Sequence, residues 1–276
     1  FGMKLSKGTP GVAMDWNQAR AQYERDSFLL PDFRVSQETL SAISDAHERL
    51  IKRHPRVSEY CPALLDFDLE FLDFARDPMI LDMFEAMIGP DIILWNMSFF
   101  AKPARTGRRI PWHQDGEYWE MRPLATCTVW IAIDDTTTEN GCMRVILGSH
   151  RSGCLLAHET NPSREVVLHE QLKDGQFNEA DAVDLVLGAG QVSLHDVYMV
   201  HGSEPNRSEH SRRALTMRFM PSTSLYDRDV EAEHFKDLHG RAPTSRSIFL
   251  MRGEDRHGDN DFRVRPGINA PELNRG

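Results

Sequence analysis

Short strand-like runs separated by turns fill the middle of the chain, and this pattern limits the possible folds most strongly. From Ile92 onward, runs rich in β-branched and aromatic residues alternate with turn clusters such as Glu139-Asn140-Gly141. The expected strands are 92–100, 126–133, 143–147, 183–187, 191–195 and 213–219. No helical period between them is long enough for regular βαβ units. We therefore expect a mainly β fold, either an antiparallel sandwich or a barrel.

The first third of the chain is predicted to be mainly helical. Asp15 can cap a short helix that runs to about Arg25, and Ser36 can cap a longer helix that ends before Pro55. The longer helix has apolar residues at the spacing of a one-sided helix, namely Leu40, Ile43, Ala46, Leu50 and Ile51. The remaining expected elements are a brief strand at 28–30 and short helices at 68–75 and 78–88. We expect these helices to flank the β core.

The chain is expected to form one domain over residues 3–276. A length of 276 residues suggests about two domains, but barrels and sandwiches of this size often fold as one. The expected parts are a helical part at about 12–90, a β core at about 91–221 and a C-terminal extension at 222–276. Residues 155–182 are polar and weakly periodic, and we expect them to form a lid-like insertion.

The charge of the chain disfavours polyanionic partners. The 42 acidic and 32 basic residues give a net charge of -10, which repels nucleic acid and anionic membrane surfaces. No run approaches the roughly 18 apolar residues of a membrane-spanning helix, and no signal peptide is recognisable. The four cysteines form no CxxC pair. We therefore expect a cytoplasmic protein with reduced thiols that acts on a small-molecule substrate.

One segment, Pro111-Trp112-His113-Gln114-Asp115, carries the spacing of a metal site. Side chains at i and i+2 of a strand share a face, so His113 and Asp115 can present a nitrogen and an oxygen to one ion. With a second histidine they would form the facial triad of non-haem Fe(II) oxygenases, which leaves three positions open. The spacing also fits a strand-end histidine that is hydrogen-bonded to a neighbouring carboxylate. A second match, His257-Gly258-Asp259, lies in the charged tail and is interpreted as a solvated loop.

Five ordered segments resemble the phytanoyl-CoA dioxygenase family of Fe(II)- and 2-oxoglutarate-dependent oxygenases, which also includes ectoine hydroxylase. They are WHQD, TCTVWIAIDD, ENGCMRVILGSH, HGSEPN and RRAL, and they extend over about residues 25–221. The resemblance implies a double-stranded β-helix, a jelly-roll or cupin-like core, in which His113, Asp115 and His201 bind Fe(II) and act as the catalytic centre. It also implies that 2-oxoglutarate and O2 are consumed and that succinate and CO2 are released. The chain departs from the family at Leu147, where proline is usual.

The family places an arginine eleven residues after the second histidine, which is Arg212 here, to hold the far carboxylate of 2-oxoglutarate. A guanidinium suits this role because it is a rigid two-pronged donor that keeps its charge. Strand parity agrees with this choice. Arg212 shares a face with the small residues Ala214 and Thr216, whereas Arg213 shares one with Leu215. Arg213 is therefore interpreted as a packing or surface arginine.

The same resemblance assigns four further residues to the co-substrate pocket, namely Gln114, Trp130, Ser203 and Ser98. From the residues alone, Trp130 also fits an apolar core and Ser203 fits a cap of the turn after His201. Halogenating relatives have a small residue in place of the carboxylate of Asp115. Asp115 therefore argues against halogenation, and the resemblance implies hydroxylation of an unactivated C–H bond.

The segment before the metal motif is basic although the chain is acidic. Lys102 to Arg109 contains four cations in eight residues, which can steer a carboxylate, phosphonate or phosphate, or can simply be a solvated loop. After Asp115, the residues Glu117, Tyr118 and Trp119 offer a carboxylate and aromatic faces to a cationic group. Together these features favour a small charged or zwitterionic metabolite over a long acyl-CoA.

Two other classes of protein fit the same motif. A cupin-like metal enzyme that does not use 2-oxoglutarate would not need Arg212 to face the metal. A non-catalytic small-molecule-binding protein on the same barrel would show no turnover. The sequence contains no HExxH, GxSxG, GxGxxG or P-loop motif. No motif therefore supports a zinc peptidase, a serine hydrolase or a nucleotide-binding protein.

Overall fold

The computed structural model describes residues 14–230 and 246–265. By their packing, these residues divide into two compact units. Unit 1 contains the described residues up to Cys61, then Phe99–Glu117 and Thr128–Thr216. Unit 2 contains Pro62–Ser98, Tyr118–Cys127 and the described residues from Met217 onward. The single domain over 3–276 stays a prediction, and residues 231–245 and 266–276 of the expected extension lie outside the described residues.

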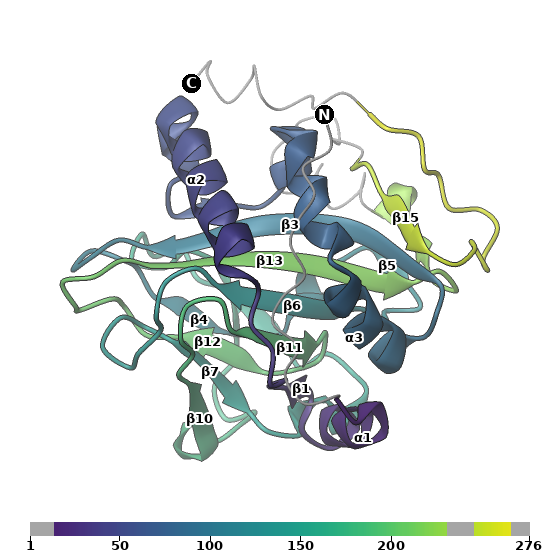
Figure 1. The fold of residues 1–276 in the computed structure, drawn as a ribbon. Coiled ribbons are helices and arrows are strands. Elements are labelled where there is room, and N and C mark those ends of the chain that lie inside the picture. Colours follow the sequence, from purple (N-terminus) through teal and green to yellow (C-terminus); the bar gives the residue numbers. More distant parts are fainter. Residues whose placement is uncertain (1–13, 231–245, 266–276) are drawn as a thin grey trace. The chain divides into compact units, whose positions relative to one another are not determined.

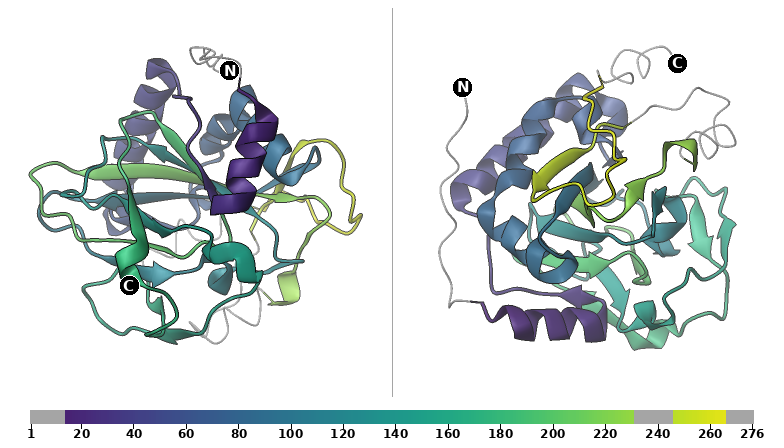
Figure 2. Two further views of the ribbon diagram at one scale, coloured as in Figure 1. Left: turned by 90° about the horizontal axis from the view of Figure 1, so that it is seen from below. Right: turned by 90° about the vertical axis from the view of Figure 1, so that its right-hand side faces the viewer.

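The helices follow the sequence signals closely. The α-helices are α1 Trp16–Asp26, α2 Gln37–Arg53 and α3 Pro78–Ile88, and the 3-10 helices are η1 Pro55–Val57, η2 Leu64–Asp66, η3 Leu69–Arg76, η4 Asp115–Tyr118, η5 Ser149–Ser152 and η6 Glu179–Asp181. The predicted caps are confirmed, because Asp15 accepts from the backbone of α1 and Ser36 accepts from Thr39 N at the start of α2. Figure 2 shows α1 and α2, the purple helices, from two further sides. No helix in the described ranges is both long and apolar enough to cross a membrane.

Unit 1 holds a four-stranded antiparallel sheet in the order β10-β7-β12-β4 (Figure 1). Its strands are β10 Ala182–Leu185, β7 Met143–Ile146, β12 His201–Ser203 and β4 Ile110–His113. The register pairs His201 of β12 directly with His113 of β4. Residues that are directly opposite on antiparallel strands point to the same face, so this pairing brings two distant histidines together.

A larger sheet has the order β1-β11-β6-β13-β3-β15, with β2 also paired to β3. Its strands are β1 Phe28–Leu29, β2 Tyr60–Cys61, β3 Ile92–Lys102, β6 Cys127–Ala132, β11 Val192–Asp196, β13 Arg212–Pro221 and β15 Phe249–Arg252. The core of unit 1 lies between the two sheets, where Trp130 of β6 and Ala214 of β13 cluster with Met143 and Val145 of β7. The mainly β, jelly-roll fold that the sequence predicts is therefore confirmed.

The polar segments contain strands that the sequence pattern did not reveal. In the 155–182 insertion, β8 His158–Thr160 and β9 Glu170–Leu172 form a two-stranded antiparallel sheet. In unit 2, β14 Leu225–Tyr226 pairs with β5 Met121–Arg122, and β15 pairs with β3. The extension from residue 222 is thus partly built into sheets, because its short apolar run around Phe249 supplies an edge strand.

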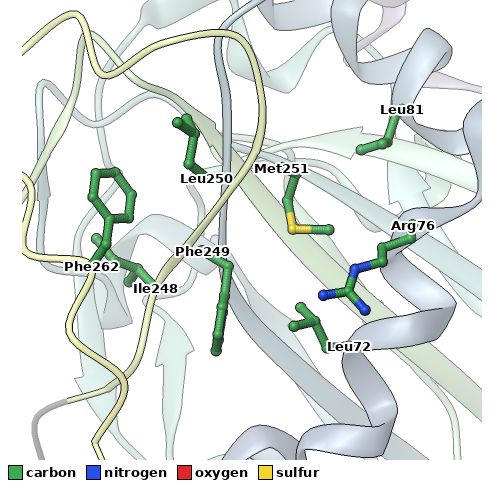
Figure 3. A pocket seen from close by; sticks show the side chains of 8 residues that line it. All are labelled: Leu72, Arg76, Leu81, Ile248, Phe249, Leu250, Met251 and Phe262. Carbon is green, nitrogen blue, oxygen red and sulfur yellow. The ribbon is translucent and has the colours of Figure 1, made fainter. Parts of the chain in front are cut away.

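Unit 2 also has an apolar groove of about 410 Å³ (Figure 3). It is lined by Leu72, Arg76, Leu81, Ile248, Phe249, Leu250, Met251 and Phe262. Arg76 is the one charged residue in this lining, and its guanidinium also pairs with Asp73 at 2.5 Å. None of the predicted site residues lines the groove.

The buried histidine of α2 leads to a prediction about acid stability. Burial, with a smaller effect of Arg213, lowers the pKa of His47 from 6.5 to about 4. The unfolded chain therefore takes up a proton near pH 6.5 that the folded chain takes up only near pH 4, so stability is lost as the pH falls through this window. We expect the free energy of unfolding to fall by about 2 kcal/mol between pH 7 and pH 5 on account of His47. Urea denaturation at the two pH values measures this loss. In His47→Leu the loss should shrink by that amount, and an unchanged loss would contradict the assignment.

Candidate active site

The β4–β12 pairing places two histidines and one aspartate at one point of unit 1. The rings of His113 and His201 have centroids 4.2 Å apart. The expectation that His113 and Asp115 lie on one strand is wrong, because β4 ends at His113 and Asp115 opens η4. Gly116 N donates to Val197 O at 3.2 Å, and this bond belongs to the turn that brings Asp115 back beside His113.

The three side chains direct their ligand atoms at one another. Oδ1 of Asp115 lies 3.6 Å from Nε2 of His113 and 4.0 Å from Nε2 of His201. One ligand atom from each residue lies within 4.8 Å of the others, and all three residues are buried. Two imidazole nitrogens and one carboxylate oxygen form the donor set of a facial triad, so these residues fit Fe(II).

Backbone carbonyls fix the protonation of both imidazoles. Nδ1 of His113 lies 2.8 Å from Pro111 O, and Nδ1 of His201 lies 2.9 Å from Met199 O. A carbonyl oxygen can only accept, so each Nδ1 carries the proton and each Nε2 keeps its lone pair for a metal. Burial, together with the neighbouring His113, lowers the pKa of His201 to about 3. His201 is therefore neutral at physiological pH, as a metal ligand must be.

Arg212, the first residue of β13, is a buried cation. Its Nε and Nη2 donate to Gly141 O at 3.1 and 2.7 Å, and its exposed fraction is 2%. Among the described residues, no carboxylate forms an ion pair with it. Burial lowers the pKa of Arg212 to about 10. A buried guanidinium without an anion is unfavourable, so this position suits the carboxylate of a ligand.

The neighbouring arginine is used differently, as strand parity predicts. Arg213 donates to both oxygens of Asp134, at 2.9 and 2.8 Å, and lies 3.6 Å from Glu48. Its interpretation as a packing or surface arginine is confirmed.

Two of the four further pocket residues lie beside Arg212 in unit 1. The guanidinium of Arg212 sits 5.6 Å from the ring centroid of Trp130, and its Nη2 is 3.5 Å from Oγ of Ser203. Trp130 also belongs to the core cluster, as the residues alone allowed. Ser98 lies in unit 2, where its hydroxyl donates to Pro62 O and accepts from Arg218 Nη1 at 2.7 Å.

Gln114, between two of the triad residues, uses its amide within the chain. Its Nε2 donates to Tyr198 O at 2.7 Å, and its Oε1 accepts from Leu156 N at 2.7 Å. Nε2 of His158 accepts from Gln114 N at 3.2 Å, and its Nδ1 lies 3.5 Å from Oε2 of Glu117. The insertion is therefore attached to the metal segment. Sequence reasoning missed His158, because an isolated histidine in a polar loop carries no local signal.

The basic segment is mostly occupied by internal contacts. Lys102 is 1% exposed and donates to the carbonyls of Arg108 and Glu204 at 2.6 and 2.7 Å, and burial lowers its pKa to about 6. Arg105 pairs with Glu209, and Arg108 pairs with Glu59. In the part of the chain that the structure describes, the guanidinium of Arg109 has no hydrogen bond or ion pair.

A fourth residue beside the triad, His195 of β11, was also missed from the sequence. Its Nε2 lies 3.4 Å from Oδ2 of Asp115, and its ring centroid is 5.0 Å from that of His201. It is 3% exposed. The strand that carries it was predicted, but nothing in a single sequence indicates which side chain that strand turns toward Asp115.

Comparisons with known proteins show the family to which the chain belongs. Residues 23–214 match the phytanoyl-CoA dioxygenase (PhyH) family. A phytanoyl-CoA dioxygenase domain-containing protein 1 homolog of Dictyostelium discoideum is 32% identical over 171 residues, which are 60% of this chain and 61% of that protein. Peroxisomal phytanoyl-CoA dioxygenase of Bos taurus is 28% identical over 242 residues, covering 78% and 71%. A probable alpha-ketoglutarate-dependent hypophosphite dioxygenase of Stutzerimonas stutzeri is 29% identical over 157 residues, covering 52% and 50%.

Solved structures share the fold. The non-heme monooxygenase ThoJ superposes with a TM-score of 0.69 at 24% identity, covering 92% of this chain and 93% of that one. EvdO2 from Micromonospora carbonacea var. aurantiaca, complexed with 2-oxoglutarate, has a TM-score of 0.62 at 23% identity, covering 78% and 93%. With the family match over 23–214, the chain belongs to the phytanoyl-CoA dioxygenase family and is a 2-oxoglutarate-dependent non-haem iron dioxygenase.

Proposed function

We propose that unit 1 contains the active site of an Fe(II)- and 2-oxoglutarate-dependent hydroxylase, with His113, Asp115 and His201 as the iron ligands. The observation that carries this proposal is the aim of three buried ligand atoms at one point, with both histidines held as Nδ1–H tautomers. In the same unit, the buried Arg212 offers a charged donor to the far carboxylate of 2-oxoglutarate. Trp130 and Ser203 would support that carboxylate, and Gln114 and Ser98 are the further predicted pocket residues.

The protein contributes positioning and protection from water. The oxidising chemistry comes from bound iron with 2-oxoglutarate and O2, and it yields succinate and CO2. His113, Asp115 and His201 would hold the iron through three ligand atoms, and a facial triad of this kind leaves ligand positions open for the co-substrates. Arg212 would orient 2-oxoglutarate through charged hydrogen bonds to its far carboxylate. Burial of these groups excludes bulk water and strengthens each electrostatic contact.

The substrate we propose is a small charged metabolite that is hydroxylated at a C–H bond. Arg109 supports an anionic group on it, because this half-buried guanidinium has no partner among the described residues. The relative named as a hypophosphite dioxygenase acts, by that name, on a small anion. A cationic group has less support, since the ring of Trp119 already carries Arg218, 5.2 Å from its centroid. Glu117 remains half-exposed beside His158.

An anaerobic titration tests the proposed function. Apoprotein is mixed with Fe(II) and then with 2-oxoglutarate while the visible spectrum is recorded. We expect a weak charge-transfer band that requires both additions, because a 2-oxo acid chelated to Fe(II) absorbs there and neither component does so alone. Iron binding without the band would indicate a cupin-like enzyme that does not use 2-oxoglutarate. Failure to bind iron would indicate a non-catalytic binding protein. Small anions and zwitterions can then be screened for perturbation of the band.

A further inference from the structure

His195 stands outside the triad yet faces one of its members. It lies on β11, where it pairs with Phe28 of β1, and its side chain is buried. Its Nε2 is 3.4 Å from Oδ2 of Asp115. No part of the triad chemistry described above requires this histidine.

The two oxygens of Asp115 face different partners. Oδ1 is the atom near both metal-binding nitrogens, at 3.6 Å from His113 Nε2 and 4.0 Å from His201 Nε2. Oδ2 is the atom near His195. The carboxylate is therefore oriented with one oxygen toward the metal position and the other toward a ring nitrogen.

The surroundings of His195 indicate which of its nitrogens carries the proton. Nδ1 is buried and has no hydrogen-bond partner among the described residues. A buried N–H group without an acceptor costs folding free energy, whereas an unprotonated ring nitrogen without a donor costs less. A carboxylate can only accept. The favoured tautomer of His195 therefore has the proton on Nε2, the nitrogen that lies 3.4 Å from Oδ2 of Asp115.

We propose that His195 is a positioning residue that keeps Asp115 bound to iron through a single oxygen. This inference rests on the proposed function. On a six-coordinate iron, two histidines, one carboxylate oxygen and two oxygens of 2-oxoglutarate would fill five positions and would leave the sixth for O2. If Asp115 chelated iron through both oxygens, no position would remain. By holding Oδ2, His195 preserves the O2 position without touching it.

Nitric oxide, which binds Fe(II) where O2 does, provides the test. The anaerobic complex of protein, Fe(II) and 2-oxoglutarate is titrated with nitric oxide, and the electron paramagnetic resonance signal of the adduct is followed. His195→Leu removes the donor, and His195→Gln keeps an N–H at similar reach. We expect nitric oxide affinity to fall about tenfold or more in His195→Leu and to stay within about twofold of wild type in His195→Gln. His47→Leu, another buried histidine of unit 1, is the matched control and should leave the affinity unchanged.

Several results would overturn the proposal. Wild-type affinity in His195→Leu would show that Oδ2 needs no donor, and an equal loss in His195→Gln would show that packing is what matters. If His195→Leu does not fold, X-ray absorption of the wild-type Fe(II) protein decides, since a two-oxygen Asp115 contradicts the proposal and a one-oxygen Asp115 retained in His195→Gln supports it. Absence of Fe(II) binding by the wild type would overturn the proposed function itself, which separates the two failures.

Discussion

Replacing His113, Asp115 or His201 with alanine is expected to lower 2-oxoglutarate turnover by more than about 100-fold. Loss of a residue that only hydrogen-bonds to a metal ligand already lowers metal affinity or activity by about 10- to 100-fold. Each residue supplies one of three converging ligand atoms, and two ligands do not hold Fe(II) in the same geometry. Residues that act as one unit are not additive, so a double variant should be no slower than a single one. Succinate formation and Fe(II) affinity are the measurements.

The chain provides a matched control for this prediction. His257 and Asp259 repeat the His-x-Asp spacing and lie 3.4 Å apart, but Asp259 is 78% exposed at its side chain. Alanine at either position should leave succinate formation and Fe(II) affinity unchanged. Full activity in any one of the three triad variants would contradict the assignment of the iron ligands.

Arg212→Met is expected to raise the dissociation constant of 2-oxoglutarate by about 30-fold or more, because losing one side of a buried charge pair costs at least about 2 kcal/mol. Methionine fills a similar volume but donates no hydrogen bond. Arg212→Lys should recover only part of the loss, since an ammonium cannot make the two parallel bonds. Turnover at saturating 2-oxoglutarate should fall less than affinity does. The charge-transfer band measured at increasing 2-oxoglutarate gives the constant directly.

The adjacent arginine is the control for this second prediction. Arg213→Met breaks the ion pair with Asp134 and should lower thermal stability while leaving the 2-oxoglutarate constant unchanged. A rise in the 2-oxoglutarate dissociation constant for Arg213→Met, with none for Arg212→Met, would contradict the prediction from strand parity. It would show that the arginine on the other face of β13 binds the carboxylate of 2-oxoglutarate.

Local signals explain what the sequence could predict. Ser36 and Asp15 cap their helices through neighbouring amides, and the β-branched runs become strands within a few residues of their expected ends. These properties depend on residues close in the chain. The candidate triad could also be predicted, because His113 and Asp115 are two positions apart in the chain and the family pattern supplied His201.

The remaining features depend on contacts between distant segments. His195 meets Asp115 across 80 positions of the chain, and His158 reaches Gln114 from the insertion. Neither a hydrophobic periodicity nor a helix cap in the sequence indicates such long-range contacts. The strand expected through Asp115 failed for a related reason, since the turn at Gly116 involves a bond to the distant Val197. β15 was hidden because its apolar run is short and lies in a charged tail.

The amide of Gln114 joins the insertion to the iron ligands, and this has a thermodynamic consequence. One end of the amide holds Leu156 and the other holds Tyr198, while its backbone neighbours are His113 and Asp115. Linkage between two sites is reciprocal. If a molecule binds to the insertion and raises the affinity for the metal, the bound metal should raise the affinity for that molecule by the same factor. The effect of substrate on iron affinity and the effect of iron on substrate affinity would then measure the same coupling free energy. The uncharged side chain of Gln114 would contribute part of that coupling.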